Sequence, residues 1–189
     1  MGNFKAVYVL YVLLRLVGIA NASFEGYESS WMLEHGESAS YHPLITKEAA
    51  QALKNKIGGA DSKWVQNVRT TLSYELLKGN DKLRVSTTLF KDCLDQDAYG
   101  LGVSRGKMVL NQRVYMGVAL GLYMIDAQGW EDAGFYRYWW EFSEDRGLVP
   151  IAGAELNINL FKHKNVEINF NNYLNPLVTN HYLAFGVRF

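Results

Sequence analysis

Residues 112–125 read QRVYMGVALGLYMI, and two kinds of side chain alternate along them. Large apolar residues occupy every second position from Val114 to Met124, whereas the positions between them hold Gly, Ala, Tyr and Arg. This alternation is typical of a β-strand with two different surroundings, because successive side chains point to opposite faces. The stretch has 14 residues, which exceeds the ~9–11 residues with which a tilted strand crosses a bilayer.

The same period of two continues from residue 68 to residue 189. Turn-forming residues such as Gly79-Asn80-Asp81 and Asn175-Pro176 interrupt it at intervals. Eight strands are therefore predicted, at residues 68–78, 82–91, 97–105, 112–125, 135–142, 148–161, 165–172 and 180–189.

In several of these strands a face of large apolar residues lies opposite a face of small, polar and charged residues. Ile168 and Phe170, for example, alternate with Glu167 and Asn169. Small residues mixed with charges favour the crowded polar lumen of a transmembrane barrel. Such a sheet must close, because an open edge in hydrocarbon leaves unpaired N–H and C=O groups. We predict an all-β fold, an eight-stranded antiparallel transmembrane β-barrel, with a soluble exported β-sandwich as the alternative.

The first 22 residues have the pattern of a secretory signal peptide. Lys5 precedes an apolar run at 6–19 that only Arg15 interrupts, and Ala20-Asn21-Ala22 supplies small residues for cleavage. Residues 46–57 have the spacing of a short amphipathic helix. The predicted organisation is a signal peptide at 1–22, an N-terminal segment with this helix at 23–66, and the barrel at 67–189. The predicted location is the bacterial outer membrane.

The composition argues against several classes of function. The formal net charge is +0, so no basic field points to nucleic acid. The single cysteine, Cys93, cannot form an internal disulfide, and the four histidines are not at the spacing of metal ligands. We therefore predict no nucleic-acid partner, no metal and no cofactor.

Charged residues recur on the predicted lumen face of the strands. Because buried charges must be paired, they are expected to fill the barrel as salt bridges, while a polar site or a proton relay is the functional alternative. This predicted network comprises Arg69, Glu75, Arg84, Arg113, Arg137, Glu141, Glu155, Glu167 and Arg188.

Four local stretches are similar to the bacterial lipid A palmitoyltransferase family: LVPIAG at 148–153, NYLNP at 172–176, HYLAFGVRF at 181–189 and, more loosely, GLGVSR at 100–105. A short amphipathic helix followed by eight strands also resembles that family. The resemblance implies a barrel in a lipopolysaccharide-rich membrane that modifies lipid A. Phe189 closing an alternating strand resembles the signal that the barrel assembly machinery reads.

Catalytic residues do not carry over from this resemblance. The nearest match to the family's adjacent Asp-Ser is Asp126-Ala127, and the nearest match to the His-x-Ser of lipid A deacylases is His163-Lys164-Asn165. Both lack the serine, so Asp126 and His163 remain candidates without an assigned role.

Three functions are compatible with this sequence. The first is a non-enzymatic outer-membrane barrel with a structural role or a surface protein partner, and the second is a lipid A acyltransferase or deacylase with a diverged site. The third is a soluble exported binding protein. The partners expected for the first two are outer-membrane lipid or lipopolysaccharide and the barrel assembly machinery.

The exported chain should begin at Ser23, because the small residues at 20–22 follow an apolar run of signal length. N-terminal sequencing of protein extracted from membranes checks this. A sequence beginning at Met1 would show that residues 1–22 are retained as an anchor.

Overall fold

The computed structural model describes residues 26–41, 64–92, 96–132, 140–143, 145–175 and 179–189. The predicted signal peptide and the predicted helix at 46–57 lie outside these residues. The elements are β1 (Glu28–Tyr41), β2 (Trp64–Lys78), β3 (Asp81–Lys91), β4 (Asp97–Val109), β5 (Val114–Asp126), α3 (Ala127–Asp132), β6 (Trp140–Ser143), β7 (Arg146–His163), β8 (Val166–Leu174) and β9 (Thr179–Arg188).

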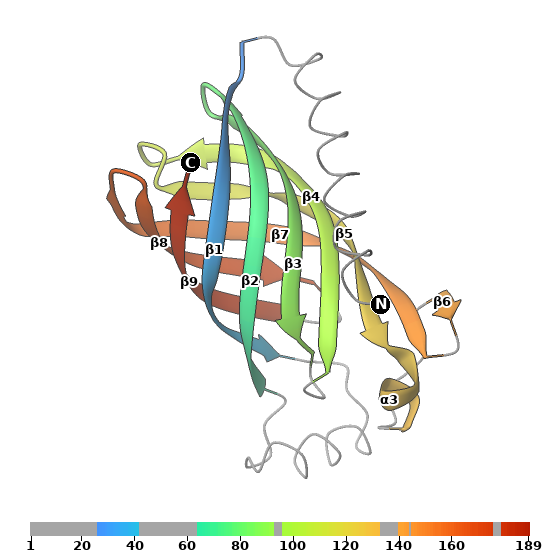
Figure 1. Cartoon of the computed structure of the whole chain (residues 1–189). Helices are drawn as coiled ribbons and strands as arrows, with labels where there is room; N and C mark the ends of the chain where they lie inside the picture. Colours follow the sequence, from blue (N-terminus) through green and yellow to red (C-terminus); the bar gives the residue numbers. More distant parts are fainter. Residues whose placement is uncertain (1–25, 42–63, 93–95, 133–139, 144, 176–178) are drawn as a thin grey trace.

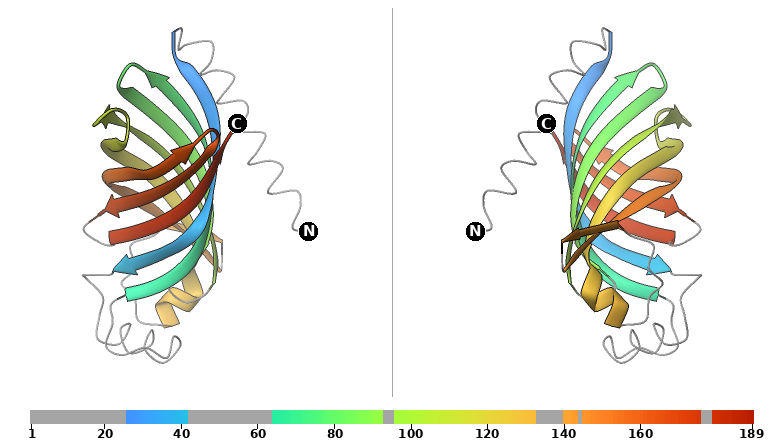
Figure 2. Two further views of the ribbon diagram at one scale, coloured as in Figure 1. Left: turned by 90° about the vertical axis from the view of Figure 1, so that its left-hand side faces the viewer. Right: turned by 90° about the vertical axis from the view of Figure 1, so that its right-hand side faces the viewer.

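The described strands form one antiparallel sheet that closes on itself (Figures 1 and 2). Its order is β5-β4-β3-β2-β1-β9-β8-β7-β6, and an additional pairing of β5 with β7 completes the ring. Eight strands make the closed wall, because β6 pairs only with the start of β7, where Trp140 lies opposite Leu148. The prediction of an eight-stranded antiparallel barrel is confirmed, and the alternative of a two-sheet sandwich is wrong.

The predicted strands differ from the structure in two places. The wall contains β1, which the sequence analysis does not predict, and barrel strands thus begin at Glu28, upstream of the predicted start at residue 67. The predicted strand at 135–142 is not part of the wall, because β5 pairs directly with β7 and the ring closes without it. Residues 140–142 belong to the short β6, beside the barrel in Figure 1, and residues 135–139 lie outside the described part of the chain. The other seven predicted strands each overlap an observed one.

The two ends of the barrel differ in their connections. At one end, here called the turn end, tight turns at residues 79–80, 110–113 and 164–165 join the strands. Gly79 has a φ of +59° in the first of these turns, a conformation that glycine adopts without strain. The start of β1 also lies at the turn end, where Trp31 and Phe189 exchange backbone hydrogen bonds of 2.8 and 3.0 Å. The opposite end, the loop end, carries the longer connections, including α3 and β6.

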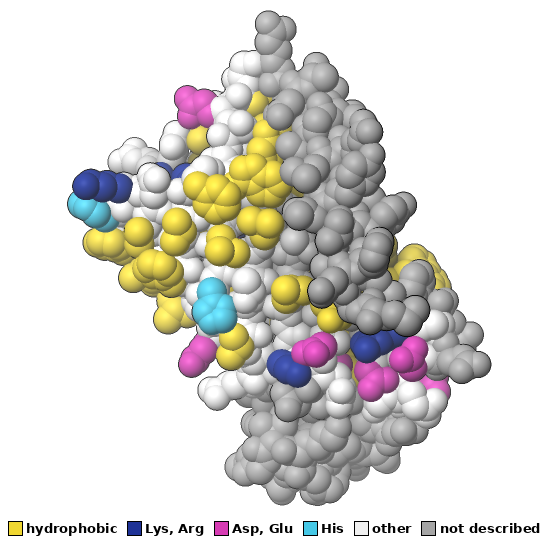
Figure 3. Space-filling view, in the orientation of Figure 1, with side chains coloured by type: hydrophobic (Ala, Val, Ile, Leu, Met, Phe, Trp, Pro, Cys, Tyr) yellow, Lys and Arg dark blue, Asp and Glu magenta, His cyan; other side chains and the backbone are white. Residues whose placement is uncertain are grey.

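The outer wall is apolar and the interior is polar, which inverts the pattern of a soluble protein. Leu120 is 60% exposed and Phe185 is 54% exposed on the outside, whereas Ser73 and Glu75 are buried inside. Figure 3 shows the hydrophobic side chains as a band across the described part of one outer face, with charged side chains below it. The predicted faces of residues 112–125 and 180–189 are confirmed. No helix among the described residues is long and apolar enough to cross a membrane.

Leu120→Arg should reduce the yield of folded barrel strongly, because an Arg on the lipid face near the bilayer midplane costs ~2–4 kcal/mol. Gly102→Ser is the matched lumen control, since a Cβ at Gly102 would lie 3.4 Å from Ser86 Oγ, an ordinary contact. Gly121 would be a poor control, because its Cβ would lie 2.7 Å from the Leu101 carbonyl oxygen.

The measurement for these variants is heat-modifiable mobility on a gel after assembly in cells. Equal yields of Leu120→Arg and Gly102→Ser would contradict the assignment of the two faces.

Candidate functional site: the charged lumen

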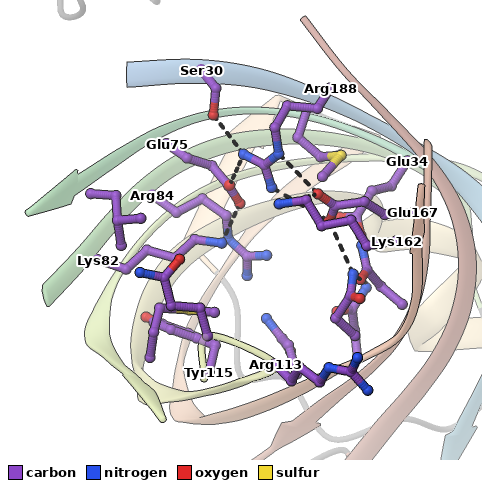
Figure 4. A pocket seen from close by; sticks show the side chains of 18 of the residues that line it. Ser30, Glu34, Glu75, Lys82, Arg84, Arg113, Tyr115, Lys162, Glu167 and Arg188 are labelled. Atoms are coloured by element: carbon purple, nitrogen blue, oxygen red, sulfur yellow. Dashed lines mark hydrogen bonds and ion pairs between the residues drawn. The ribbon is translucent and has the colours of Figure 1, made fainter. Parts of the chain in front are cut away.

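Arg188 on β9 is the hub of the lumen near the turn end (Figure 4). Its Nη1 donates to Glu75 Oε2 at 2.7 Å, and its Nε donates to Glu167 Oε1 at 3.0 Å. Nη1 also donates to Ser30 Oγ. One guanidinium therefore links β9 to β1, β2 and β8, which include both neighbours of β9 in the sheet. The five N–H donors of an arginine in a planar fork suit this role.

Two lysines add further positive charge around this hub. Lys82 Nζ lies 2.6 Å from Glu75 Oε1, and Lys162 Nζ lies 3.5 Å from Glu167 Oε1. Both carboxylates are buried, so each needs the positive charge that surrounds it. The result is an alternation of acidic and basic groups across the lumen rather than a patch of one sign.

A second polar layer lies deeper in the barrel, away from the turn end. Arg84 on β3 pairs with Glu155 on β7 at 2.5 Å, a bond that crosses the lumen between strands that are not neighbours. Glu34 on β1 accepts hydrogen bonds from Asn169 Nδ2 at 3.0 Å and from Asn171 Nδ2 at 3.1 Å.

The amide of Asn159 connects the two layers. Its Nδ2 donates to Asn169 Oδ1 at 2.8 Å and to Glu167 Oε2 at 3.2 Å. Glu34, which accepts from Asn169, and Glu167, which binds Arg188, therefore belong to one network. A fully connected network of this kind fixes the positions of its members.

Arg69 on β2 is held differently, toward the loop end. Its guanidinium donates to Tyr123 Oη at 2.8 Å and to Asn180 Oδ1 at 3.1 Å. It also lies 5.5 Å from the ring centroid of Phe90 and 5.7 Å from that of Tyr182, within the range of cation–π attraction. No carboxylate among the described residues forms an ion pair with Arg69.

These described side chains line two cavities. The larger, of about 270 Å³, lies toward the turn end and is the pocket in Figure 4. The smaller, of about 80 Å³, lies nearer the loop end. Both are lined by Glu34, Arg84 and Asn171, so these side chains separate them. The structure thus has a lumen largely filled by side chains, as expected for a barrel of eight strands.

The structure brings together most of the predicted lumen residues. Arg69, Glu75, Arg84, Glu155, Glu167 and Arg188 all take part in the interactions above. Arg113 lines the larger cavity without an ion pair to any described residue. Arg137 lies outside the described residues, and nothing is described of the Glu141 side chain.

Three charged members were missed from the sequence. Glu34 lies on the unpredicted strand β1, and Lys82 shares the face of Arg84, where the alternation could have indicated it. Lys162 follows a register shift between Asn159 and Phe161, which breaks the alternation on which the prediction relies.

The two catalytic candidates lie at opposite ends of the barrel. Asp126 ends β5 at the loop end, where its Oδ1 accepts a 3.2 Å hydrogen bond from the backbone N–H of Gly129 in α3. His163 ends β7 at the turn end, opposite Val166. The structure therefore does not bring the two candidates together, and the Asp126 carboxylate caps the start of α3. No group of three or more His, Cys, Asp or Glu residues in the described part of the chain could hold a metal ion.

Comparison with solved structures supports the fold. The chain is similar to the crystal structure of neisserial surface protein A (NspA), with a TM-score of 0.53 and 14% identity over 87% of this chain and 98% of that one. It also matches a designed transmembrane β-barrel, with a TM-score of 0.42 and 10% identity over 85% of this chain and 95% of that one. Ail, the attachment invasion locus protein of Yersinia pestis, matches with a TM-score of 0.41 and 13% identity over 88% of this chain and 100% of Ail.

The closed sheet and the similarity to NspA define the class of fold, an all-β, closed eight-stranded antiparallel barrel that resembles outer-membrane barrels. No protein-family model matches the chain, and no curated protein sequence does. The likeness to the lipid A palmitoyltransferase family therefore stays a resemblance of short stretches.

Arg188→Gln should lower the free energy of unfolding by about 2 kcal/mol or more, because the buried carboxylates of Glu75 and Glu167 each lose a charge-assisted hydrogen bond to the guanidinium. The two carboxylates, Glu75 and Glu167, would keep only Lys82 and Lys162. Urea unfolding of the refolded barrel measures the change.

Lys91→Gln is the control, because Lys91 forms an exposed pair with Asp97 at 2.7 Å. Its loss should change stability by no more than ~1 kcal/mol. Adding Glu167→Gln to Arg188→Gln should restore part of the stability. Equal effects of the Arg188 and Lys91 substitutions would show that the lumen network does not hold the barrel together.

Proposed function

We propose that this protein spans the outer membrane of a bacterium and acts there in a surface interaction, without catalysis. The observation that carries the proposal is the combination of an apolar outer wall with a lumen filled by paired charges. Such a wall is stable in lipid, where every backbone group must be paired within the protein, and the closed sheet meets that condition. A lumen filled in this way is suited to stability rather than to transport.

The two ends suggest an orientation. Outer-membrane barrels have short turns on the periplasmic side and longer loops outside the cell. By this rule the turn end faces the periplasm and the loop end faces outward. The proposed route to this position is export with cleavage after Ala22, followed by insertion through the barrel assembly machinery with β9 as the recognised strand.

The loop end is organised as a surface for a partner. The Trp130 indole in α3 donates to Asp92 Oδ2 at 2.7 Å, which ties the β5–β7 connection to the end of β3. The Gln96 N–H donates to Asp92 Oδ1 at 2.9 Å, and Arg146 Nη1 donates to the Asp97 carbonyl at 3.3 Å. Next to these contacts Trp140 on β6 is 62% exposed. A fixed platform with an exposed tryptophan is suited to binding a protein, because tryptophan is enriched among the residues that dominate binding energy.

Lipid A modification is the competing proposal, based on the resemblance at 148–153, 172–176 and 181–189. It has no assigned catalytic residue, because Asp126-Ala127 and His163-Lys164-Asn165 both lack the serine of the motifs that they resemble. Mass spectrometry of lipid A from cells with and without the protein should therefore give identical spectra. A new acylated or deacylated species would favour the enzyme instead.

Location and orientation can be tested with single cysteines in a Cys93→Ser background. A membrane-impermeant maleimide added to intact cells should label Glu131→Cys at the loop end and leave Asn80→Cys at the turn end unlabelled until the cells are broken. Heat-modifiable protein in the outer-membrane fraction is expected alongside.

Two results would count against the proposal. Recovery of the protein in the soluble fraction would contradict the proposed membrane location. Labelling of position 80 alone in intact cells would show that the orientation is the opposite of the proposed one.

A further inference from the structure

The exposed charges of the barrel are distributed unequally between its two ends. At the loop end the basic residues Lys91 and Arg146 each have an acidic partner, Asp97 at 2.7 Å and Asp145 at 3.9 Å. At the turn end exposed basic residues outnumber exposed acidic ones. The exposed charges there are Lys78, Arg105, Lys107, Arg113, Lys162 and Lys164 against Glu28 and Asp81.

Three of these basic side chains, Arg105, Lys107 and Lys164, form what is here called the basic collar. Lys107 lies opposite Asp81 where β4 pairs with β3. The Asp81 carboxylate lies 3.9 Å from Lys107 Nζ, and both side chains are exposed. Asp81 therefore offsets the charge of Lys107 alone among the three.

Arg105 is the member whose position is hardest to explain without a ligand. It follows Leu101 and Val103 on the outer face of β4, and it lies between Leu83 and Val118 on the neighbouring strands. No carboxylate among the described residues forms an ion pair with it. An unpaired cation set into an apolar wall must reach a polar region, and a long side chain does so by extending to the membrane interface.

Lys164 repeats this situation on the other side of the barrel. It lies in the β7–β8 turn, next to the exposed apolar residues Leu160 and Phe161 at the end of β7. Lys164 likewise has no ion pair to a described carboxylate. Figure 3 shows basic side chains beside hydrophobic ones at this edge of the molecule.

We infer that the basic collar binds the phosphate groups of anionic glycerophospholipids in the membrane leaflet at the turn end. This inference rests on the proposed membrane-spanning function and adds a lipid partner to it. Basic residues next to the hydrocarbon region are attracted to anionic headgroups, and the attraction falls off within a Debye length. The collar is positively charged and exposed, and it lies where the apolar wall meets the turn end. The basic residues Lys91 and Arg146 at the loop end are instead paired with acidic ones.

The test compares two double variants that each remove two basic charges. Arg105→Gln with Lys107→Gln removes part of the collar, and Lys91→Gln with Arg146→Gln is the matched control at the loop end. Each protein, in the full chain, is refolded into vesicles of phosphatidylcholine alone and of equal parts phosphatidylcholine and phosphatidylglycerol. The unfolding equilibrium in urea is then measured in both lipids.

The unaltered protein should be more stable in the anionic vesicles. The measured quantity is the ratio of the unfolding constant in phosphatidylcholine to that in the anionic vesicles. In the collar variant this ratio should fall about fivefold for each charge removed. The control should keep the full ratio, and high salt should abolish it in every protein.

Two outcomes overturn the inference and are distinguishable. If the collar variant, the control and the unaltered protein depend equally on the lipid, the proposed lipid site is wrong, while the proposed membrane-spanning barrel is unaffected. Failure of all three to insert into either vesicle, seen as the absence of heat-modifiable mobility, would remove the proposed function as well.

Discussion

Closure of the sheet between β1 and β9 is the constraint on which the rest of this structure depends. Ten residue pairs, from Met32 opposite Arg188 to Tyr41 opposite Thr179, join strands that are separated by most of the chain. Without this pairing both strands would present a row of unpaired N–H and C=O groups. In hydrocarbon each unpaired group costs several kcal/mol, so an open form of this sheet is not a stable membrane structure.

Closure in turn dictates what the interior can be. A ring of eight strands leaves a lumen that side chains largely fill, and here the inward faces supply Glu, Arg, Asn and Tyr. Buried charges are stable only when they are matched, and the ion pairs of Arg84 with Glu155 and of Arg188 with Glu167 join different strands. Arg188 is the clearest case, because it connects β9 to both of its neighbours and to β2. The polar interior therefore reinforces the same seam that the backbone closes.

Sequence alternation is a reliable guide only where one face is uniformly apolar. This holds for β5 and β9, whose faces were predicted correctly. It fails for β1, where His35 and Glu37 lie on the outer face and hide the period. The alternation at 135–142 does not predict a wall strand correctly, because β5 pairs directly with β7.

Contacts across the lumen could not be predicted from the sequence, because no local pattern encodes them. Glu34 and Asn169 lie on strands far apart in sequence, and only closure brings them within 3.0 Å. The sequence indicated which faces carry charge, and so it predicted that Arg188 would have an acidic partner. It did not indicate which acidic residue of the predicted network each arginine would meet. The closed ring assigns Glu167 to Arg188 and Glu155 to Arg84.

Because side chains largely fill the lumen, the function is sought at the two ends of the barrel. The ends share the same strands, so their differences come from the connections and the charges placed on them. At the turn end the connections are short and the exposed charge is mainly basic, and the lipid contact proposed above is based on these two features. At the loop end the chain adds a helix, a short strand and a buried Asp92–Trp130 hydrogen bond that lie outside the ring of eight strands. The ring closes without them, since β5 pairs directly with β7. These additions are the reason for proposing that a partner binds at the loop end.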